Sequence, residues 1–346
     1  MRTTRIVAVS AAAGMISIAA PAAVAQDPAA FYKGKQISIV VGYGPGGAYD
    51  AYVRALSGHY SRFIPGNPQI VIQYMPGAGS LVAANHTARI APADGTVLGV
   101  FSLTTALAPV FGNKAAQFDP LKFNWIGNMY SDAAGCAAWT GSSVTTLADM
   151  IGAKTETIFG ATGPDASGTH QALTLKSILG ANLKLITGYK GIKEVGLALE
   201  KGEIAVACSM SVGAVRSAFD ADYQSGRMRI IVQLGRQKEP YFKNAPHIYT
   251  DFKLGPEQRA VADLVFGQSD VSRPIIGPPG MPATIVTALR KAFMETLADK
   301  AFLADAERLK VEITPMSGEA TTARVAEFTR APPAVVEKVK GLLGIR

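Results

Sequence analysis

The feature that most constrains this chain is a repeated alternation of short apolar runs with amphipathic segments. In the first part of the chain, the pattern predicts strands at 37–41, 69–74 and 97–101, separated by helices at 48–63 and 80–90. Alternation of this kind is typical of a parallel α/β sheet with right-handed crossovers. The first part of the chain is therefore predicted to form an α/β unit around a parallel sheet.

A second series of the same kind follows residues 125–129. It predicts strands near 135–139, 157–161, 183–186, 205–209 and 229–234, with intervening helices at 168–179, 192–200 and 212–219. A last strand at 272–276 and a helix at 283–298 follow a proline-rich stretch. No linker separates the two series, so we expect two α/β units with chain crossovers at a hinge.

The N-terminus has the composition of a secretory signal peptide. Arg2 and Arg5 precede an apolar stretch at 6–20, and the small residues 23–25 come just before Gln26. A membrane anchor needs about 20 apolar residues, and this run is shorter. Residues 1–25 are therefore interpreted as a cleaved leader, which places the mature protein in the periplasm.

Charge and cysteine content narrow the function classes. The formal net charge is +8 and is spread without dense basic runs, so nucleic-acid binding is not favoured. After the leader, no apolar stretch reaches the roughly 18 residues of a membrane span. The two cysteines, Cys136 and Cys208, could pair in an oxidising compartment or stay buried and unpaired, and the sequence leaves both open.

A glycine-rich turn at 42–47 follows the first predicted strand. It formally fits the dinucleotide pattern G-x-G-x-x-G, but no acidic residue lies between Asp50 and Asp94 to hold a ribose. No Lys-Ser or Lys-Thr pair follows the glycines, so a P-loop is excluded. What remains is a turn of backbone amides before a helix N-terminus, which suits an anion, and no cofactor is expected.

Polar residues near helix starts offer several interpretations. Ser80 is interpreted as a helix cap, whereas Ser167 and Thr169 are predicted to contact a ligand. Asp50 could favour the helix dipole, accept a hydrogen bond from a ligand amine or hydroxyl, or orient the turn. His170 follows Ser167 by three residues, but no G-x-S-x-G motif surrounds any serine, so a secreted serine hydrolase is only a weak alternative. The histidines show no metal-ligand spacing, and no metal site is expected.

Five short motifs occur along the chain in a characteristic order. They are Gly-Pro-Gly-Gly-Ala-Tyr-Asp at 44–50, Met-Pro-Gly-Ala-Gly-Ser at 75–80, Ala-Pro-Ala-Asp-Gly-Thr at 91–96, Gly-Tyr-Lys-Gly at 188–191 and Gly-Pro-Pro-Gly-Met-Pro at 277–282. In this order they resemble the extracytoplasmic solute receptors of the tripartite tricarboxylate transporter family, also called Bug or TctC-like proteins. The resemblance covers essentially the whole mature chain.

The resemblance implies an α/β type II periplasmic-binding-protein fold, with two domains, a hinge and an interdomain ligand cleft. Domain 1 would comprise residues 26–130 and 235–346, and domain 2 residues 131–234. The implied function is a monomeric, non-enzymatic receptor that binds a small carboxylate by domain closure. It would deliver this ligand to a membrane permease of the tripartite tricarboxylate type, or alternatively act as a periplasmic sensor for carboxylate signalling.

Receptors of this family hold a ligand carboxylate largely through backbone amides and waters at the first glycine turn, with hydroxyl-bearing loops from both domains. Carried onto this chain, the implied ligand-binding positions are Tyr43, Gly44, Gly46, Gly47, Ala48, Tyr49, Asp50, Gly79, Ser102, Thr104, Thr162, Ser167, Gly168, Thr169, His170, Tyr189, Ser209 and Ser211.

Three features of these loops bear on the ligand. No arginine lies in them, so recognition is expected to use dipoles and waters without an arginine clamp. Tyr43, Tyr49 and Tyr189 could form an aromatic wall for a ligand tail or pack between the domains. Asp165 is expected near the mouth of the cleft, which disfavours a multiply charged anion such as citrate.

Overall fold

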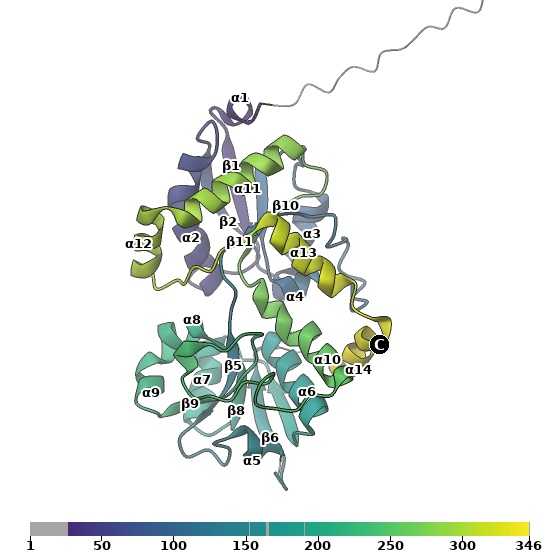
Figure 1. Cartoon of the computed structure of the whole chain (residues 1–346). Coiled ribbons are helices and arrows are strands. Elements are labelled where there is room, and N and C mark those ends of the chain that lie inside the picture. The colour runs from purple at the N-terminus through teal and green to yellow at the C-terminus, as the bar shows by residue number, and fades with distance from the viewer. Residues whose placement is uncertain (1–26, 152, 164–165, 190, 346) are drawn as a thin grey trace, which may run out of the picture.

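The computed structural model describes residues 27–151, 153–163, 166–189 and 191–345. The predicted leader, residues 1–25, lies outside the described residues. One sheet contains β1 (Gln36–Val41), β2 (Gln69–Tyr74), β3 (Val97–Val100), β4 (Asn124–Asn128), β10 (Pro274–Gly277) and β11 (Met316–Ser317). The other contains β5 (Ala134–Trp139), β6 (Thr157–Ala161), β7 (Leu183–Thr187), β8 (Val206–Ser211) and β9 (Met228–Gln233). Figure 1 shows the first sheet above the second.

Both sheets are mixed, which corrects the expectation of parallel sheets. The first has the order β11-β4-β10-β3-β1-β2 and the second β7-β6-β8-β5-β9. The strands β1, β2 and β3 pair in parallel as predicted, but β10 runs antiparallel to β3 and β4. Likewise β5 runs antiparallel to β8 and β9. The physical reason is the path of the chain. Both β5 and β10 follow a segment that crosses from the other sheet, so each strand begins at the end of its sheet that faces the other one.

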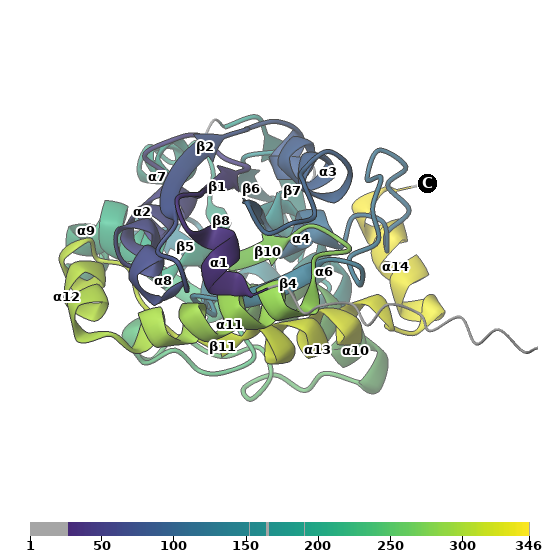
Figure 2. The same cartoon turned by 90° about the horizontal axis from the view of Figure 1, so that it is seen from above.

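Helices cover both sheets. Those packed around the first sheet are α1 (Pro28–Tyr32), α2 (Ala48–Tyr60), α3 (Leu81–Arg89), α4 (Leu103–Ala106), α11 (Ala283–Ala298), α12 (Lys300–Arg308) and α13 (Gly318–Thr329). Those of the second are α5 (Leu147–Ile151), α6 (Ser167–Leu179), α7 (Ile192–Glu200), α8 (Val212–Ala214) and α9 (Asp220–Gln224). Figure 2 shows α11 and α3 on opposite sides of the first sheet.

Strand β1 shows why its segment folds as it does. Ile37 and Ile39 lie on either side of the more exposed Ser38 and are fully buried, and they pack with Val53 and Leu56 of α2 in one apolar cluster. Burial of this apolar face is the main driving force for docking α2 on the sheet. The glycine turn that joins β1 to α2 is thereby held between two firmly packed elements.

Two late helices, α10 (Pro256–Phe266) and α14 (Pro333–Leu343), lie beside α6 (Figure 1). The Gln258 side-chain amide donates to the Ile178 carbonyl oxygen at 2.7 Å, and Lys338 pairs with Glu257 at 2.6 Å. Residues after 235 therefore contact elements of both sheets. These contacts do not fix the domain boundaries at 130/131 and 234/235, which stay predictions.

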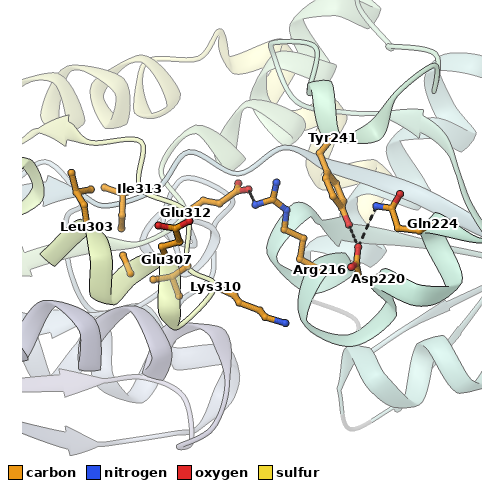
Figure 3. Close-up of a pocket in the computed structure, with 11 residues that line it drawn as sticks. Arg216, Asp220, Gln224, Tyr241, Leu303, Glu307, Lys310, Glu312 and Ile313 are labelled. Atoms are coloured by element: carbon orange, nitrogen blue, oxygen red, sulfur yellow. Dashed lines mark hydrogen bonds and ion pairs between the residues drawn. The ribbon is translucent and has the colours of Figure 1, made fainter. Parts of the chain in front are cut away.

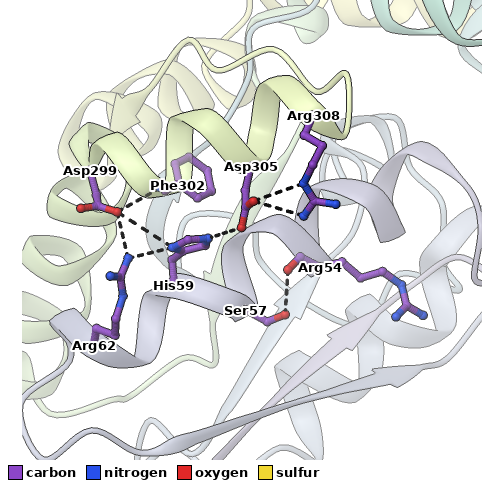
Figure 4. A network of polar contacts seen from close by, with 8 residues as sticks. All are labelled: Arg54, Ser57, His59, Arg62, Asp299, Phe302, Asp305 and Arg308. Atoms are coloured by element: carbon purple, nitrogen blue, oxygen red, sulfur yellow. Dashed lines mark hydrogen bonds and ion pairs between the residues drawn. The ribbon is translucent and has the colours of Figure 1, made fainter.

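Helix α12 is docked on α2 by a polar network (Figure 4). His59 Nε2 lies 2.8 Å from Asp305 Oδ2, and Arg62 donates to Asp299 Oδ1 at 2.8 Å. The His59 ring also meets the Phe302 ring edge to face, with centroids 5.8 Å apart. These contacts fix α12 and the segment that follows it, which carries Glu312.

A disulfide joins Cys136 in β5 to Cys208 in β8. The two strands are antiparallel neighbours, and both cysteines are buried. The structure thus selects the paired state from the two alternatives that the sequence leaves open. Within the described ranges, no helix combines the length and apolar character needed to cross a bilayer.

Candidate functional site

A cleft of about 810 Å³ lies between the two sheets. Its wall contains residues that follow β1 and β3, residues that follow β6, the end of β8, and the segment just before β10. A volume of this size lies within the usual range for small-molecule sites. The cleft is therefore the leading candidate for a ligand site.

The cleft brings together many of the residues predicted to bind a ligand. The predicted residues that line it are Tyr43, Tyr49, Gly79, Ser102, Thr104, Thr162, Ser167, Gly168, His170, Ser209 and Ser211. Those that do not line it are Gly44, Gly46, Gly47, Ala48, Asp50, Thr169 and Tyr189. Asp165 lies outside the described residues. Ligand contact by any of these residues stays a prediction.

Asp50 holds the glycine turn in place. Its buried carboxylate accepts hydrogen bonds from the Gly46 backbone N–H at 2.7 Å, from Arg54 Nε at 2.8 Å and from the Tyr74 hydroxyl. Burial raises the pKa of Asp50, but these hydrogen bonds outweigh it and leave the pKa below its ordinary value. Of the three interpretations of Asp50, the structure therefore favours the one in which it orients the turn.

The turn at 77–80 forms another part of the cleft wall and has an unusual backbone. All four residues have positive φ, including 79° at the buried Ser80, a conformation that side chains rarely adopt. The Ser80 hydroxyl donates to Thr105 Oγ1 at 3.1 Å, and Thr105 donates to the Gly79 carbonyl oxygen at 2.6 Å. Ser80 occupies the N-cap position of α3 without capping it through its side chain. The expected cap is thus wrong, because the side chain serves Thr105 instead.

On the opposite wall, α6 begins in the cleft. Its N-cap is Ala166, which has no side-chain oxygen to satisfy the first helical amides. The Thr169 hydroxyl donates to the Gly163 carbonyl oxygen at 2.6 Å and so holds the preceding loop. Gln171 accepts a hydrogen bond from the Ser209 backbone N–H at 2.7 Å, where Ser209 has a φ of 63°. The amides and hydroxyls at this wall suit an anionic ligand.

Tyr43 and Tyr49 form an aromatic wall at the cleft. Their rings are stacked, with centroids 4.3 Å apart and an angle of 19° between planes. Tyr189 instead packs against a separate apolar cluster. Tyr43 and Tyr49 also pack against the apolar cluster of the first sheet, so all three tyrosines take part in packing, and a role in holding a ligand tail stays a prediction.

Sequence reasoning missed a charged pair at the base of the cleft. Arg273 is 9% exposed and lines the cleft, with its guanidinium carbon 4.6 Å from the Tyr49 ring centroid. Its Nη2 lies 3.9 Å from Oδ2 of Asp132, which also lines the cleft. The matched loops contain no arginine, but the cleft wall does: Arg273 lies outside the five motifs, on the segment that returns to β10. A single arginine before a wholly apolar strand is the signal that could have found it. Recognition without an arginine clamp stays a prediction.

Asp132 offers a prediction about pH. Burial raises its pKa to about 6, although the Arg273 charge and the nearby Ser211 and Tyr130 hydroxyls oppose this change and Glu312 adds to it. Since an unfolded Asp titrates near about 3.9, the folded protein binds more protons between roughly pH 4 and 6. Stability associated with Asp132 is therefore present at low pH and is lost as the pH rises through this window.

Asp132→Asn removes this titration. Its free energy of unfolding, relative to wild type, should therefore rise by roughly 1–3 kcal/mol between about pH 4 and pH 7. Urea unfolding of both proteins across this range measures the difference. A difference that does not change with pH would contradict the raised pKa.

A second cavity of about 520 Å³ lies between α12 and the segment formed by η3 (Val215–Phe219) and α9 (Figure 3). Arg216 pairs there with Glu312, and its guanidinium carbon lies 4.7 Å from the Tyr241 ring centroid. The Tyr241 hydroxyl donates to Asp220 at 2.6 Å. Because these polar groups engage one another, this cavity is the weaker candidate. In the described part of the chain, no group of three or more His, Cys, Asp or Glu side chains could hold a metal ion.

Comparisons with known proteins find a family model and relatives that match along most of this chain. The family model described as "Tripartite tricarboxylate transporter family receptor" matches residues 64–340. The "UPF0065 protein in gbd 5'region" of Cupriavidus necator is 25% identical over 336 residues, which cover 96% of this chain and 95% of that protein.

Solved structures share the fold. The periplasmic binding protein BugD superposes with a TM-score of 0.66 at 19% identity, covering 91% of this chain and 99% of BugD. MatC from Rhodopseudomonas palustris, solved with bound malate, gives a TM-score of 0.65 at 17% identity, with coverage of 89% and 99%. The two mixed sheets therefore form a periplasmic-binding-protein fold.

Proposed function

Because this chain belongs to the tripartite tricarboxylate transporter receptor family, whose members are binding proteins and not enzymes, we propose that it captures a small carboxylate in the cleft. The observation that carries the proposal is the convergence in one cleft of hydroxyl-rich turns from both sheets and a buried guanidinium. Charge-assisted hydrogen bonds to a carboxylate are strong in such a desolvated site. The malate bound to the structural relative MatC has the same chemistry.

Capture would involve closure about the two crossing segments. These segments lie side by side, since the Asp132 backbone N–H donates to the Ser269 carbonyl oxygen at 2.8 Å and that of Ser272 to Tyr130 at 3.1 Å. A hinge needs only a few residues to absorb the change in backbone angles. A ligand that contacts both walls favours the closed state because it gains contacts there that the open state lacks.

We propose the domain limits 130/131 and 234/235 from the sequence, with α10 and α14 as exceptions. These two helices contact α6 and would move with it when closure turns about the paired segments near Asp132 and Ser269. The proposed location is the periplasm, supported by the relative BugD and by the leader-like N-terminal sequence. The proposed recipient of the ligand is a tripartite tricarboxylate-type permease. The proposed solution state is a monomer.

The test is thermal unfolding of the mature protein, freed of co-purified ligand by unfolding and refolding. A carboxylate at about 100 times its dissociation constant should add about 2.7 kcal/mol of stability and raise the melting temperature by several degrees. Mono-, di- and tricarboxylates, aromatic acids and acidic amino acids form the test panel, and sugars and simple amines are the controls. Stabilisation by sugars or amines but by no carboxylate would overturn the proposal.

A further inference from the structure

We propose that Arg273 and Asp132 form a subsite that selects carboxylates with a hydrogen-bond donor, a hydroxyl or an ammonium group, on the neighbouring carbon. This inference rests on the proposed function and names the class of ligand within it. The two residues come from different crossing segments of the hinge and meet at the base of the cleft. A ligand held by both would lie where the two halves of the protein join.

Arg273 has donors available for a carboxylate. Its Nη1 donates to the Ser272 carbonyl oxygen at 2.8 Å, but its buried Nε has no hydrogen-bond partner among the described residues. The guanidinium carbon lies 4.6 Å from the ring centroid of Tyr49 and 5.2 Å from that of Tyr52. Stacking of this kind holds the guanidinium in place. A buried, oriented guanidinium with unused donors is suited to a carboxylate, which it can bind through two parallel hydrogen bonds.

Asp132 has acceptors available for a donor. Its Oδ2 lies 3.9 Å from Arg273 Nη2, which is longer than a hydrogen bond. Its Oδ1 is buried and has no hydrogen-bond partner in the part of the chain that the structure describes. An unsatisfied buried acceptor is costly, so a ligand that donates to Asp132 recovers free energy that an aliphatic ligand does not.

The charges of the pair determine which ligands fit. A ligand carboxylate beside Arg273 gains an opposite charge, while a second carboxylate beside Asp132 would meet a like charge. A hydroxyl or ammonium group on the neighbouring carbon would instead donate to Asp132. Hydroxy and amino carboxylates are therefore expected to bind more tightly than the matching unsubstituted acids.

Succinate, malate and aspartate provide a matched test because they share a four-carbon skeleton and differ at one carbon. Calorimetry on the refolded mature protein should show malate or aspartate binding at least about 10-fold more tightly than succinate, the effect of one satisfied buried acceptor. Glutarate, 2-hydroxyglutarate and glutamate repeat the comparison with ligands that are one carbon longer. Preference for the malate-type ligand identifies a hydroxyl donor, and preference for the aspartate-type ligand an ammonium donor.

Two variants and one control test whether Arg273 and Asp132 cause the preference for hydroxy and amino carboxylates. Arg273→Met should weaken every carboxylate by about 100-fold, since it removes a charged hydrogen-bond donor. Asp132→Leu should reduce the preference over the unsubstituted acid to less than about 3-fold, because no acceptor remains. The matched control is Arg290→Met on α11, since Arg290 pairs with Glu319 at 2.8 Å and does not line the cleft. It should leave all affinities unchanged.

The outcomes separate this subsite from the receptor function. If wild type binds carboxylates but Arg273→Met binds them equally well, or Asp132→Leu keeps the preference, the subsite is wrong and the receptor function stands. If wild type binds none of the acids in either series or in the wider carboxylate panel, both proposals fail. Should Arg273→Met fail to fold, Arg273→Lys replaces it and should bind carboxylates with intermediate affinity. Should Asp132→Leu fail to fold, Asp132→Asn replaces it and should lose any preference for aspartate. A purely structural role would lower the melting temperature without changing the ratio of affinities.

Discussion

Replacement of both Cys136 and Cys208 by alanine should lower the free energy of unfolding by about 2–5 kcal/mol. The disulfide joins residues separated by 72 positions, and in the chain-entropy model a bridge of that span restricts the unfolded chain by roughly 4 kcal/mol. The two strands are already neighbours in the sheet, so the fold itself should be retained. Urea unfolding should therefore show a lower midpoint with native-like circular dichroism before the transition.

Reduction of the wild-type protein provides the control. Dithiothreitol should shift the wild-type midpoint toward that of the double variant and should leave the double variant unchanged. Because Cys208 lines the cleft and precedes Ser209, ligand affinity is measured on the same samples. Equal midpoints for the variant and the oxidised wild type would contradict a stabilising disulfide.

The sequence predicts the elements of this fold better than their directions. Apolar runs locate β1, β2 and β3 because each strand buries a local pattern of side chains, and their parallel pairing follows from the helices between them. The antiparallel direction of β5 and β10 depends on where the chain re-enters a sheet after crossing, and no local pattern encodes that. The contact of α10 and α14 with α6 is equally non-local.

The same limit applies to the candidate site. The glycine turn was recognisable as a cluster of backbone amides, but the Gly46 amide is used by Asp50, four residues further on. A sequence motif does not show which backbone amides already donate hydrogen bonds within the protein. Arg273 and Asp132 belong to no motif, and only the pairing of the crossing segments brings their side chains within 3.9 Å. Loops that follow strands were therefore predictable as parts of the cleft wall, whereas the meeting of Arg273 with Asp132 was not.

Gly42→Ala should be among the most disruptive single substitutions at the cleft. A Cβ atom at Gly42 would clash with the Ser80 Cβ and would lie 3.1 Å from the Ser80 Cα. Ser80 has little room to move, because it is buried and its hydroxyl is bonded to Thr105. We expect a loss of about 1–3 kcal/mol in the free energy of unfolding, typical of an overpacked interior. Ligand affinity should also fall, because the displaced turn at 77–80 forms part of the cleft wall. We expect a decrease of about 10-fold, which corresponds to about 1.4 kcal/mol of binding free energy.

Gly58→Ala is the matched control for this substitution. Gly58 lies in α2, is exposed, and has no atom within 4 Å of an added Cβ. Alanine there should raise the free energy of unfolding by about 0.5–1 kcal/mol, the usual helix preference over glycine, and leave affinity unchanged. If Gly42→Ala matched this control in stability, the close approach of Gly42 to Ser80 would be wrong. If it lost stability but kept full affinity, the turn at 77–80 would pack against Gly42 without taking part in ligand binding.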